Sequence, residues 1–215
     1  MSSCCADQII ALSASEQDLF KNLDESCRRA VRKGMDAGLK FEAVTMDAAQ
    51  YVDSYFNIAE ESAKRTKEEI APRSYFDDLV SYFARISRIG LCFALHNGQR
   101  VAAVLLAIDK GAASYLGGVS LPDYLPKRVN DFLHWSAIKW ANSNGLQWYR
   151  LGPVFPEAPS EWPISMVSRF KAKFGGRSWT IIQGGHYLHP DKYAAIAAEH
   201  TALMCNKTVC CKPLL

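Results

Sequence analysis

The side chains that could act as bases, nucleophiles or metal ligands are few and form no recognised catalytic pair. His96 and His134 could serve as bases by residue type, because imidazole titrates near neutral pH. His134 lies in an amphipathic helical pattern that is more typical of a packed histidine. His186 and His189 flank Tyr187, but such a pair without a third ligand is a weak indication of metal. The sequence has no G-x-S-x-G turn and no Cys/His pair at family spacing, so covalent catalysis is disfavoured and no metal is expected.

The seven cysteines fit a reducing compartment better than a disulfide scaffold, because disulfide-dense chains are usually short and secreted. The N-terminal segment has neither the basic nor the apolar stretch of an export signal, so a cytoplasmic location is expected. Free thiols near the chain ends are the preferred interpretation. A His/Cys metal cluster is the alternative, and the residues concerned are Cys4, Cys5, His200, Cys205, Cys210 and Cys211.

The composition is typical of one globular domain rather than of a membrane, fibrous or disordered protein. The chain has 215 residues, of which 49% are hydrophobic and 22% are charged. The longest uninterrupted apolar run, Val101 to Ile108, is far shorter than the roughly 18 residues that cross a bilayer, so no membrane span is expected. A net charge of +3 suits an anionic small molecule but not a dedicated nucleic-acid surface.

The hydrophobic periodicity predicts a mixed α/β order of elements. The expected helices are residues 15–34, 47–67, 72–89, 129–144, 165–174 and 191–204, and the expected strands are residues 41–44, 91–96, 100–108, 112–120, 147–151 and 178–183. Asn97-Gly98 is a strong hairpin signal and predicts an antiparallel meander over residues 91–120. We expect a flexible N-terminus at residues 1–14, one domain at residues 15–190, and a C-terminal helix with a cysteine-bearing tail at residues 191–215.

Several segments carry a resemblance to a known family, and they follow one another in a fixed order. They are NLDESCRRAVRKGMDAGLKFE, ALHNGQRVAAVLLA, ASYLGGVS, DFLHWSAIKWANSNGLQWYRLGPV and SRFKAKFGG, within residues 18–185. The element order resembles the GNAT superfamily of N-acyltransferases, and these segments resemble its Fem-type branch, which includes the aminoacyltransferases of peptidoglycan cross-bridges. The resemblance implies a single GNAT-like fold, an α/β fold with a central, mostly antiparallel, splayed sheet flanked by helices.

The sequence departs from the family pattern in two respects. Fem-type enzymes usually pair two GNAT-like halves, whereas this chain has room for one, so a homodimer is expected. GNAT enzymes cradle the acetyl-CoA pyrophosphate with a glycine-rich loop before a helix. Here that stretch is SLPDYLPKRVN, which has no glycine, and Pro122 and Pro126 each lack an N–H donor. Lys127 and Arg128 could supply charge to the acyl donor instead, or they could be two exposed cations.

The resemblance also implies site residues. The Lys of the family's "FK" pair stabilises developing negative charge, and its match here is Phe170-Lys171. We predict that Val167, Phe170 and Phe174 form the inward face of that helix, that Lys171 borders this face and that Lys173 points to solvent.

Tyr115 is the second candidate catalytic residue, although a core aromatic is its alternative. Its strand carries Gly117-Gly118, which suggests a bulge of the kind that opens the GNAT cleft over Tyr115 and Gly117, and both glycines are expected at the substrate. Arg65 or Arg73 matches the Fem-type arginine that holds a substrate phosphate, although each could be surface charge.

The sequence therefore predicts an enzyme that transfers an acyl or aminoacyl group to an amine on a small-molecule or glycan-precursor acceptor of the cell envelope. The expected donor is aminoacyl-tRNA or an acyl-CoA thioester, with no tightly bound cofactor. Two alternatives stay open. One is an acetyl-CoA-dependent N-acetyltransferase, and the other is a non-catalytic GNAT-like binding module.

Overall fold

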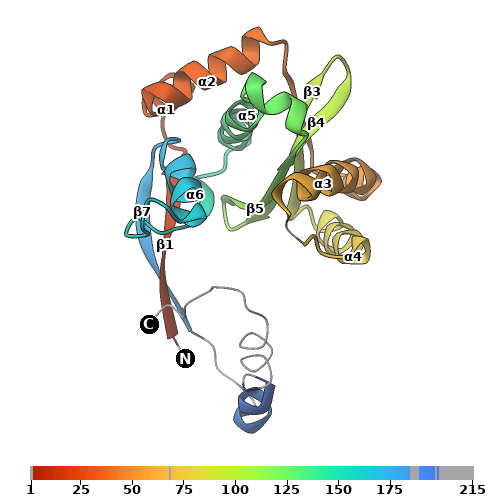
Figure 1. The fold of residues 1–215 in the computed structure, drawn as a ribbon, viewed down its shortest axis with the longest axis vertical. Coiled ribbons are helices and arrows are strands. Elements are labelled where there is room, and N and C mark those ends of the chain that lie inside the picture. Colours follow the sequence, from red (N-terminus) through yellow and green to blue (C-terminus); the bar gives the residue numbers. More distant parts are fainter. Residues whose placement is uncertain (1, 68, 185–188, 197, 199–215) are drawn as a thin grey trace. The chain divides into compact units, whose positions relative to one another are not determined.

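A computed structural model describes residues 2–67, 69–184, 189–196 and 198 (Figure 1). The chain divides into two compact units, and the larger contains residues 5–181. In the smaller unit, residues 190–196 are helical, in line with the first half of the helix expected at residues 191–204. Residues 197 and 199–204 of that expected helix, His186, and the three C-terminal cysteines lie outside the described residues.

One mixed sheet organises the chain, in the strand order β2-β3-β4-β5-β6-β1-β7. Its strands are β1 (Ser2–Ala11), β2 (Lys40–Val44), β3 (Ile89–His96), β4 (Gln99–Asp109), β5 (Ala112–Ser120), β6 (Trp148–Val154) and β7 (Arg177–Gly184). The helices are α1 (Glu16–Lys21), α2 (Glu25–Asp36), α3 (Val52–Thr66), α4 (Arg73–Ala84), α5 (Val129–Ser143) and α6 (Pro163–Ala172), with 3-10 turns η1 (Ala48–Tyr51) and η2 (Pro122–Lys127). The predicted α/β class and the mostly antiparallel sheet are confirmed.

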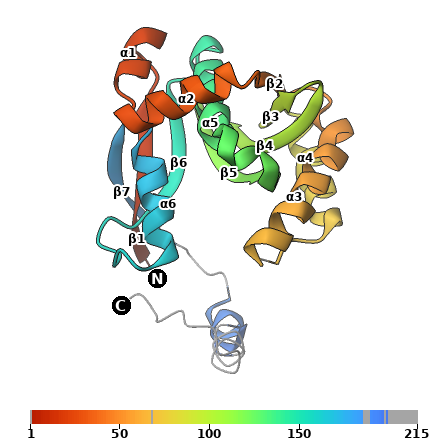
Figure 2. The ribbon, with the colours of Figure 1, turned by 45° about the horizontal axis from the view of Figure 1, so that its top comes forward.

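Helices cover both faces of the strands β3, β4 and β5 (Figure 2). Helices α2 and α5 lie on one face, over a core that includes Leu106, Leu133 and Trp135. Helices α3 and α4 lie on the other face, over a second core that includes Leu105 and Phe93. Because Leu105 and Leu106 are adjacent in β4, the alternation of side chains along a strand sends one into each core. This explains why the middle strand is apolar at consecutive positions.

The N-terminal segment is the strand β1 (Ser2–Ala11), whereas the sequence predicts a flexible end at residues 1–14. Residues 6–11 of β1 pair antiparallel with β6, from Ala6 opposite Val154 to Ala11 opposite Trp148. Ile10 and Leu12 are buried in the core. A short apolar stretch near a terminus resembles a frayed end in sequence, because its partners in β6 and β7 lie more than a hundred residues away.

The helix expected over residues 15–34 is two helices, each with its own N-cap. The Ser15 hydroxyl accepts from the Asp18 N–H at the start of α1, and the Asp24 carboxylate accepts from the Ser26 N–H at the start of α2. Capping residues favour a helix start because they satisfy N–H groups that have no partner within the helix. The expected range 15–34 begins at Ser15, the observed cap of α1, whereas Asp24 lies inside an apolar repeat that continues from Leu19 to Val31.

The turn after α6 packs directly on β1, and Gly176 makes that approach possible. Gly176 has a φ of +79°, and a Cβ there would lie 2.2 Å from the carbonyl oxygen of Ile9. Gly145 has a similar φ of +73°, but a Cβ there would meet nothing within 4 Å. A substitution at Gly145 would therefore incur only the free-energy cost of the left-handed backbone, whereas one at Gly176 would also bring a side chain into collision with β1.

Gly176→Ala should destabilise the protein considerably more than Gly145→Ala. The left-handed conformation alone costs about 1–2 kcal/mol for an L-residue, and at position 176 the backbone of β1 must also move. Urea unfolding of the two variants, followed by circular dichroism, measures the difference. Equal losses of stability would contradict the close packing of this turn on β1.

Candidate active site

A bulge in β5 lies at the centre of the candidate site. Leu105 of β4 pairs with Gly117 and the next residue, Leu106, pairs with Tyr115, so Leu116 is an extra residue without an opposite partner. The bulge predicted from Gly117-Gly118 is confirmed. Because a bulge shifts the alternation of side chains, Tyr115 faces the core under α5, whereas Gly117 faces Tyr55 of α3.

Strands β5 and β6 diverge at the same place, as the splayed sheet requires. Their parallel pairing runs only from Ala112 opposite Trp148 to Ser114 opposite Arg150. Beyond this point, a Cβ on Gly152 of β6 would lie 3.6 Å from Lys171 Nζ and 3.9 Å from the carbonyl oxygen of Tyr115. The Lys171 ammonium therefore lies where the two strands part.

Lys171 belongs to the inward face of α6. The buried residues of this helix are Ser165, Ser168 and Lys171, which recur every third position, whereas Val167 is 43% exposed. The predicted inward face is therefore wrong for Val167, and Lys171 lies within the buried stripe rather than at its border. The stripe is polar because β6 and the residue that follows it present backbone groups to it. Ser168 Oγ accepts from the N–H of Phe155, and Lys171 Nζ donates to the carbonyl oxygen of Pro153 at 2.8 Å.

The burial of Lys171 affects its charge. The residue is 8% exposed, and loss of hydration lowers the pKa of its ammonium, an effect that the nearby Asp7 carboxylate opposes. Asp7 is itself buried and forms an ion pair with Arg150, with Oδ2 2.6 Å from Nη2. Asp7 was missed in the sequence because residues 1–14 were expected to be flexible. No nearby sequence signal marks it, since its partners come from β6 and α6.

His134 lies beside Tyr115 in an aromatic cluster and is not suited to act as a base. Its ring centroid is 4.9 Å from that of Tyr115, 5.5 Å from that of Phe170 and 5.3 Å from that of Phe174. The hydroxyl of Tyr149 lies 3.4 Å from its Nδ1. Burial, together with the positive charges of Lys173 and Lys171, lowers the pKa of His134 to about 3. The imidazole therefore remains neutral near pH 7.

Lys173 is part of the packing and does not point freely to solvent. It forms an ion pair with Asp131, whose side chain is 7% exposed, and its Nζ lies 4.1 Å from the ring centroid of Phe170. The prediction of a solvent-directed Lys173 is therefore wrong. The reason is that Asp131, in the first turn of α5, lies far away in sequence. Removing Lys173 would leave a buried carboxylate without its cation, which is costly.

The remaining predicted site residues lie apart from the contacts around Lys171. Lys127 Nζ lies 2.9 Å from His96 Nε2 and 5.0 Å from the ring centroid of Tyr124, and Arg128 is exposed at the start of α5. Arg65 is exposed in the last turn of α3. Arg73 begins α4 and forms ion pairs with Asp53 and Asp77. These contacts bring none of the four cations to Lys171.

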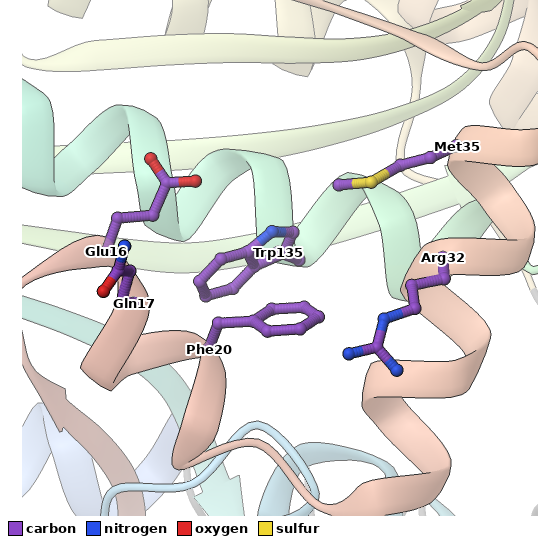
Figure 3. Close-up of a pocket in the computed structure, with 6 residues that line it drawn as sticks. All are labelled: Glu16, Gln17, Phe20, Arg32, Met35 and Trp135. Atoms are coloured by element: carbon purple, nitrogen blue, oxygen red, sulfur yellow. The ribbon is translucent and has the colours of Figure 1, made fainter.

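A hollow of about 550 Å³ lies elsewhere, between α1, α2 and α5 (Figure 3). Phe20 packs on Trp135 with ring centroids 5.1 Å apart, and Arg32 lies 5.3 Å from the Phe20 ring centroid. No predicted site residue lines this hollow. Among the described residues there is also no group of three or more metal-ligating side chains, and no helix is long and apolar enough to cross a membrane.

Comparison with known proteins identifies the family of this chain. Residues 21–162 match the family model described as "Acetyltransferase (GNAT) domain". The chain belongs to the GNAT family, whose members are N-acyltransferases. Among curated proteins, none is similar enough in sequence to count as a match.

Solved structures show the same fold at low sequence identity. The structure of FemX has a TM-score of 0.74 and 12% identity, over 89% of this chain and 63% of the FemX chain. A C-terminal domain assigned to lysylphosphatidylglycerol synthetase from Agrobacterium fabrum has a TM-score of 0.63 and 16% identity, over 95% of this chain and 66% of that one. L-PGS from Bacillus licheniformis has a TM-score of 0.60 and 14% identity, over 97% of this chain and 69% of the L-PGS chain. This chain thus spans slightly less than two thirds of the length of FemX and of the Agrobacterium fabrum domain.

The buried, neutral His134 should make the protein acid-labile. Its pKa is about 3 when folded and 6.5 in the reference state, so the unfolded chain binds more protons between these values. The contribution of His134 is fully present above pH 6.5 and falls as the pH decreases, by up to about 1.4 kcal/mol per pH unit. His134→Gln should therefore lose stability less steeply between pH 6.5 and pH 4 than the wild type, as measured by urea unfolding. The partly exposed His96→Gln is the control, and equal pH slopes for wild type and His134→Gln would contradict this assignment.

Proposed function

We propose that this protein transfers an acyl or aminoacyl group to an amine, in the manner of Fem-type cell-envelope aminoacyltransferases. The observation that carries the proposal is the buried ammonium of Lys171, which lies where β5 and β6 diverge. An acyl carbonyl placed in this opening would have a positively charged donor beside it. Such a donor is most effective in a site shielded from water, and Lys171 is 8% exposed.

The reaction requires one addition and one elimination. The amine nitrogen attacks the acyl carbonyl carbon and forms the C–N bond, while the carbonyl π electrons move to oxygen. Lys171 donates an N–H to this oxyanion, because the bond to the Pro153 carbonyl uses only one of its three hydrogens. The C–O or C–S bond to the donor then breaks, and the leaving group departs with the proton that the amine nitrogen has lost. His134 adds no charge to this step, since burial keeps it neutral.

The helix start that binds the CoA pyrophosphate in ordinary GNAT enzymes is altered here. The η2 turn contains Pro122 and Pro126, and the first turn of α5 contains the carboxylate of Asp131, already paired with Lys173. A carboxylate in the first turn of a helix interacts with the same end of the helix dipole that a phosphate would use. These features favour aminoacyl-tRNA as the donor. An acyl-CoA donor is the second candidate, favoured by the acetyltransferase family itself.

The proposed acceptor is an amine on a cell-envelope precursor. This chain shares its fold with FemX and with a domain assigned to a lysylphosphatidylglycerol synthetase, an enzyme named for an aminoacylated lipid, and this likeness supports an aminoacyl product. Because the chain spans 63% of FemX, a second copy could supply part of what the longer protein contains. The homodimer stays a prediction, and light scattering at micromolar concentration tests it.

Ligand-dependent thermal stability tests the function class. Acetyl-CoA, aminoacyl-tRNA and nucleotide-sugar precursors are each added to the full chain, and a ligand that binds the folded state raises its melting temperature. We expect aminoacyl-tRNA to raise the melting temperature more than the same tRNA without its amino acid. If none of the three stabilises the protein, the non-catalytic binding module is the better interpretation.

Lys171→Met should lower the rate of acyl transfer by about 100- to 1,000-fold, because loss of a comparable oxyanion donor costs roughly 2.7–4 kcal/mol. Donor affinity should change little, since this interaction strengthens only as charge develops. Steady-state kinetics and donor titration measure the two effects separately. Arg169→Met, on the exposed side of the same helix, is the control and should leave the rate unchanged. Equal effects of the two substitutions would refute the proposed role of Lys171.

A further inference from the structure

A large pocket lies on the face of the sheet opposite Lys171, between α3, α4 and strands β4 and β5. It has a volume of about 680 Å³. Most of its wall is aliphatic or aromatic, and the residues that matter here are Tyr55, Tyr75, Leu79, Phe83, Leu116 and Gly117. A pocket of this size with mainly apolar walls and few polar groups is the usual form of a small-molecule site.

The bulge in β5 connects this pocket to the proposed reaction centre. Leu116, the extra residue, is 52% exposed and lines the pocket together with Gly117. A Cβ on Gly117 would lie 3.4 Å from the hydroxyl of Tyr55, whose side chain comes from α3 and also lines the pocket. On the other side of the bulge is Tyr115, whose carbonyl oxygen lies 3.9 Å from the position of a Cβ on Gly152, a position that is also 3.6 Å from Lys171 Nζ. The pocket therefore reaches the strand edge at which β5 leaves β6.

The charges that line the pocket favour a cation. Arg88 forms an ion pair with Asp109, which leaves the carboxylate of Glu69 as the third charged group in the lining. With two carboxylates and one guanidinium, the lining has one excess negative charge. This excess charge lies on the exposed Glu69, and even when screened by solvent it favours an ammonium over a phosphate or a free carboxylate.

We propose that this pocket binds the acyl acceptor, and that the acceptor is a primary amine carried on an aromatic or alkyl group. The inference rests on the proposed acyl transfer to an amine, and it specifies an acceptor whose amine is carried on an apolar group rather than on a sugar. The apolar group packs against Tyr75, Leu79 and Phe83, while the nitrogen reaches the bulge beside the Tyr55 hydroxyl. An amino sugar carries hydroxyls next to its amine, and burying these against such walls is unfavourable.

Direct binding to the full chain without any donor tests this proposal. Phenethylamine and octylamine are titrated by ligand-observed NMR, together with ethanolamine, glucosamine and phenylpropionate. We expect the two apolar amines to bind at least ten times more tightly than ethanolamine and glucosamine, and the carboxylate to bind more weakly than phenethylamine. Equal affinity for the apolar and polar amines, or tighter binding of phenylpropionate, would overturn the proposal.

Two variants of α4 locate the binding. Tyr75 and Tyr82 are both exposed, at 54% and 66%, but only Tyr75 lines the pocket, so Tyr75→Ala and Tyr82→Ala form a matched pair. Tyr75→Ala should weaken phenethylamine at least fivefold, and Tyr82→Ala should leave its affinity unchanged. Leu79→Trp, which fills the pocket, should weaken it at least tenfold. If the Leu79→Trp variant binds normally, the amine binds elsewhere. If the Leu79→Trp substitution instead changes the oligomeric state, the pocket is occupied by a second copy of the chain. Normal binding by this variant and a changed oligomeric state would each overturn the proposal.

The outcome for the pocket is separable from the outcome for the reaction. If phenethylamine binds as expected but is acylated by neither aminoacyl-tRNA nor acetyl-CoA, the proposed function fails and the assignment of the pocket stands. If instead amino sugars are acylated and apolar amines do not bind, the proposed function stands and the assignment of the pocket fails.

Discussion

The hydrogen bond from Lys171 to the Pro153 carbonyl is the interaction on which the site depends. Two parallel strands that stop pairing leave backbone groups without partners in the interior, and an unpaired buried group costs about as much as a lost hydrogen bond. The β6 carbonyl beyond the divergence is satisfied by a side chain from α6 instead of by β5. The divergence of β5 from β6 therefore calls for a buried donor at the Pro153 carbonyl, and this hydrogen bond in turn stabilises the buried ammonium of Lys171. A polar stripe of Ser165, Ser168 and Lys171 on α6 is the form in which the sequence meets this requirement.

The charges around the opening follow from the same burial. Lys171 is the buried cation held by a neutral carbonyl, whereas Asp7 is paired with Arg150 and Asp131 with Lys173. Burial opposes the charged forms of Lys171 and His134 alike, and the pKa of both is lowered. The histidine can lose its charge completely near pH 7, which leaves the ammonium as the electrostatic feature that an oxyanion would meet. A protonated His134 would add a repulsive charge next to both lysines.

Local signals in the sequence were sufficient for the elements but not for the contacts of the site. The hairpin at Asn97-Gly98, the cap at Ser15 and the bulge near Gly117 each depend on a few neighbouring residues, and each is found in the structure. The partners of Lys171 and Lys173 come from β6 and α5, so the helical periodicity of α6 favoured Val167 as inward although it is exposed. Periodicity measures hydrophobicity, and here the inward face is polar because it meets backbone carbonyls and amides rather than a core.

The two faces of the β5 bulge differ in a way that suits a reaction between two substrates. A Cβ on Gly118 would lie 2.8 Å from the Tyr115 hydroxyl, and a Cβ on Gly117 would lie 3.4 Å from the Tyr55 hydroxyl, so these two hydroxyls approach the same short stretch of backbone. The face under α5 and α6 carries the ammonium of Lys171, and the face under α3 and α4 carries a pocket with excess negative charge. An electron-poor carbonyl that becomes an oxyanion is favoured on the first face, and a basic amine on the second. In the proposed reaction the two substrates meet at the edge formed by Gly117 and Gly118, which has no side chains of its own. A larger residue at either position would push the tyrosines away from the strand.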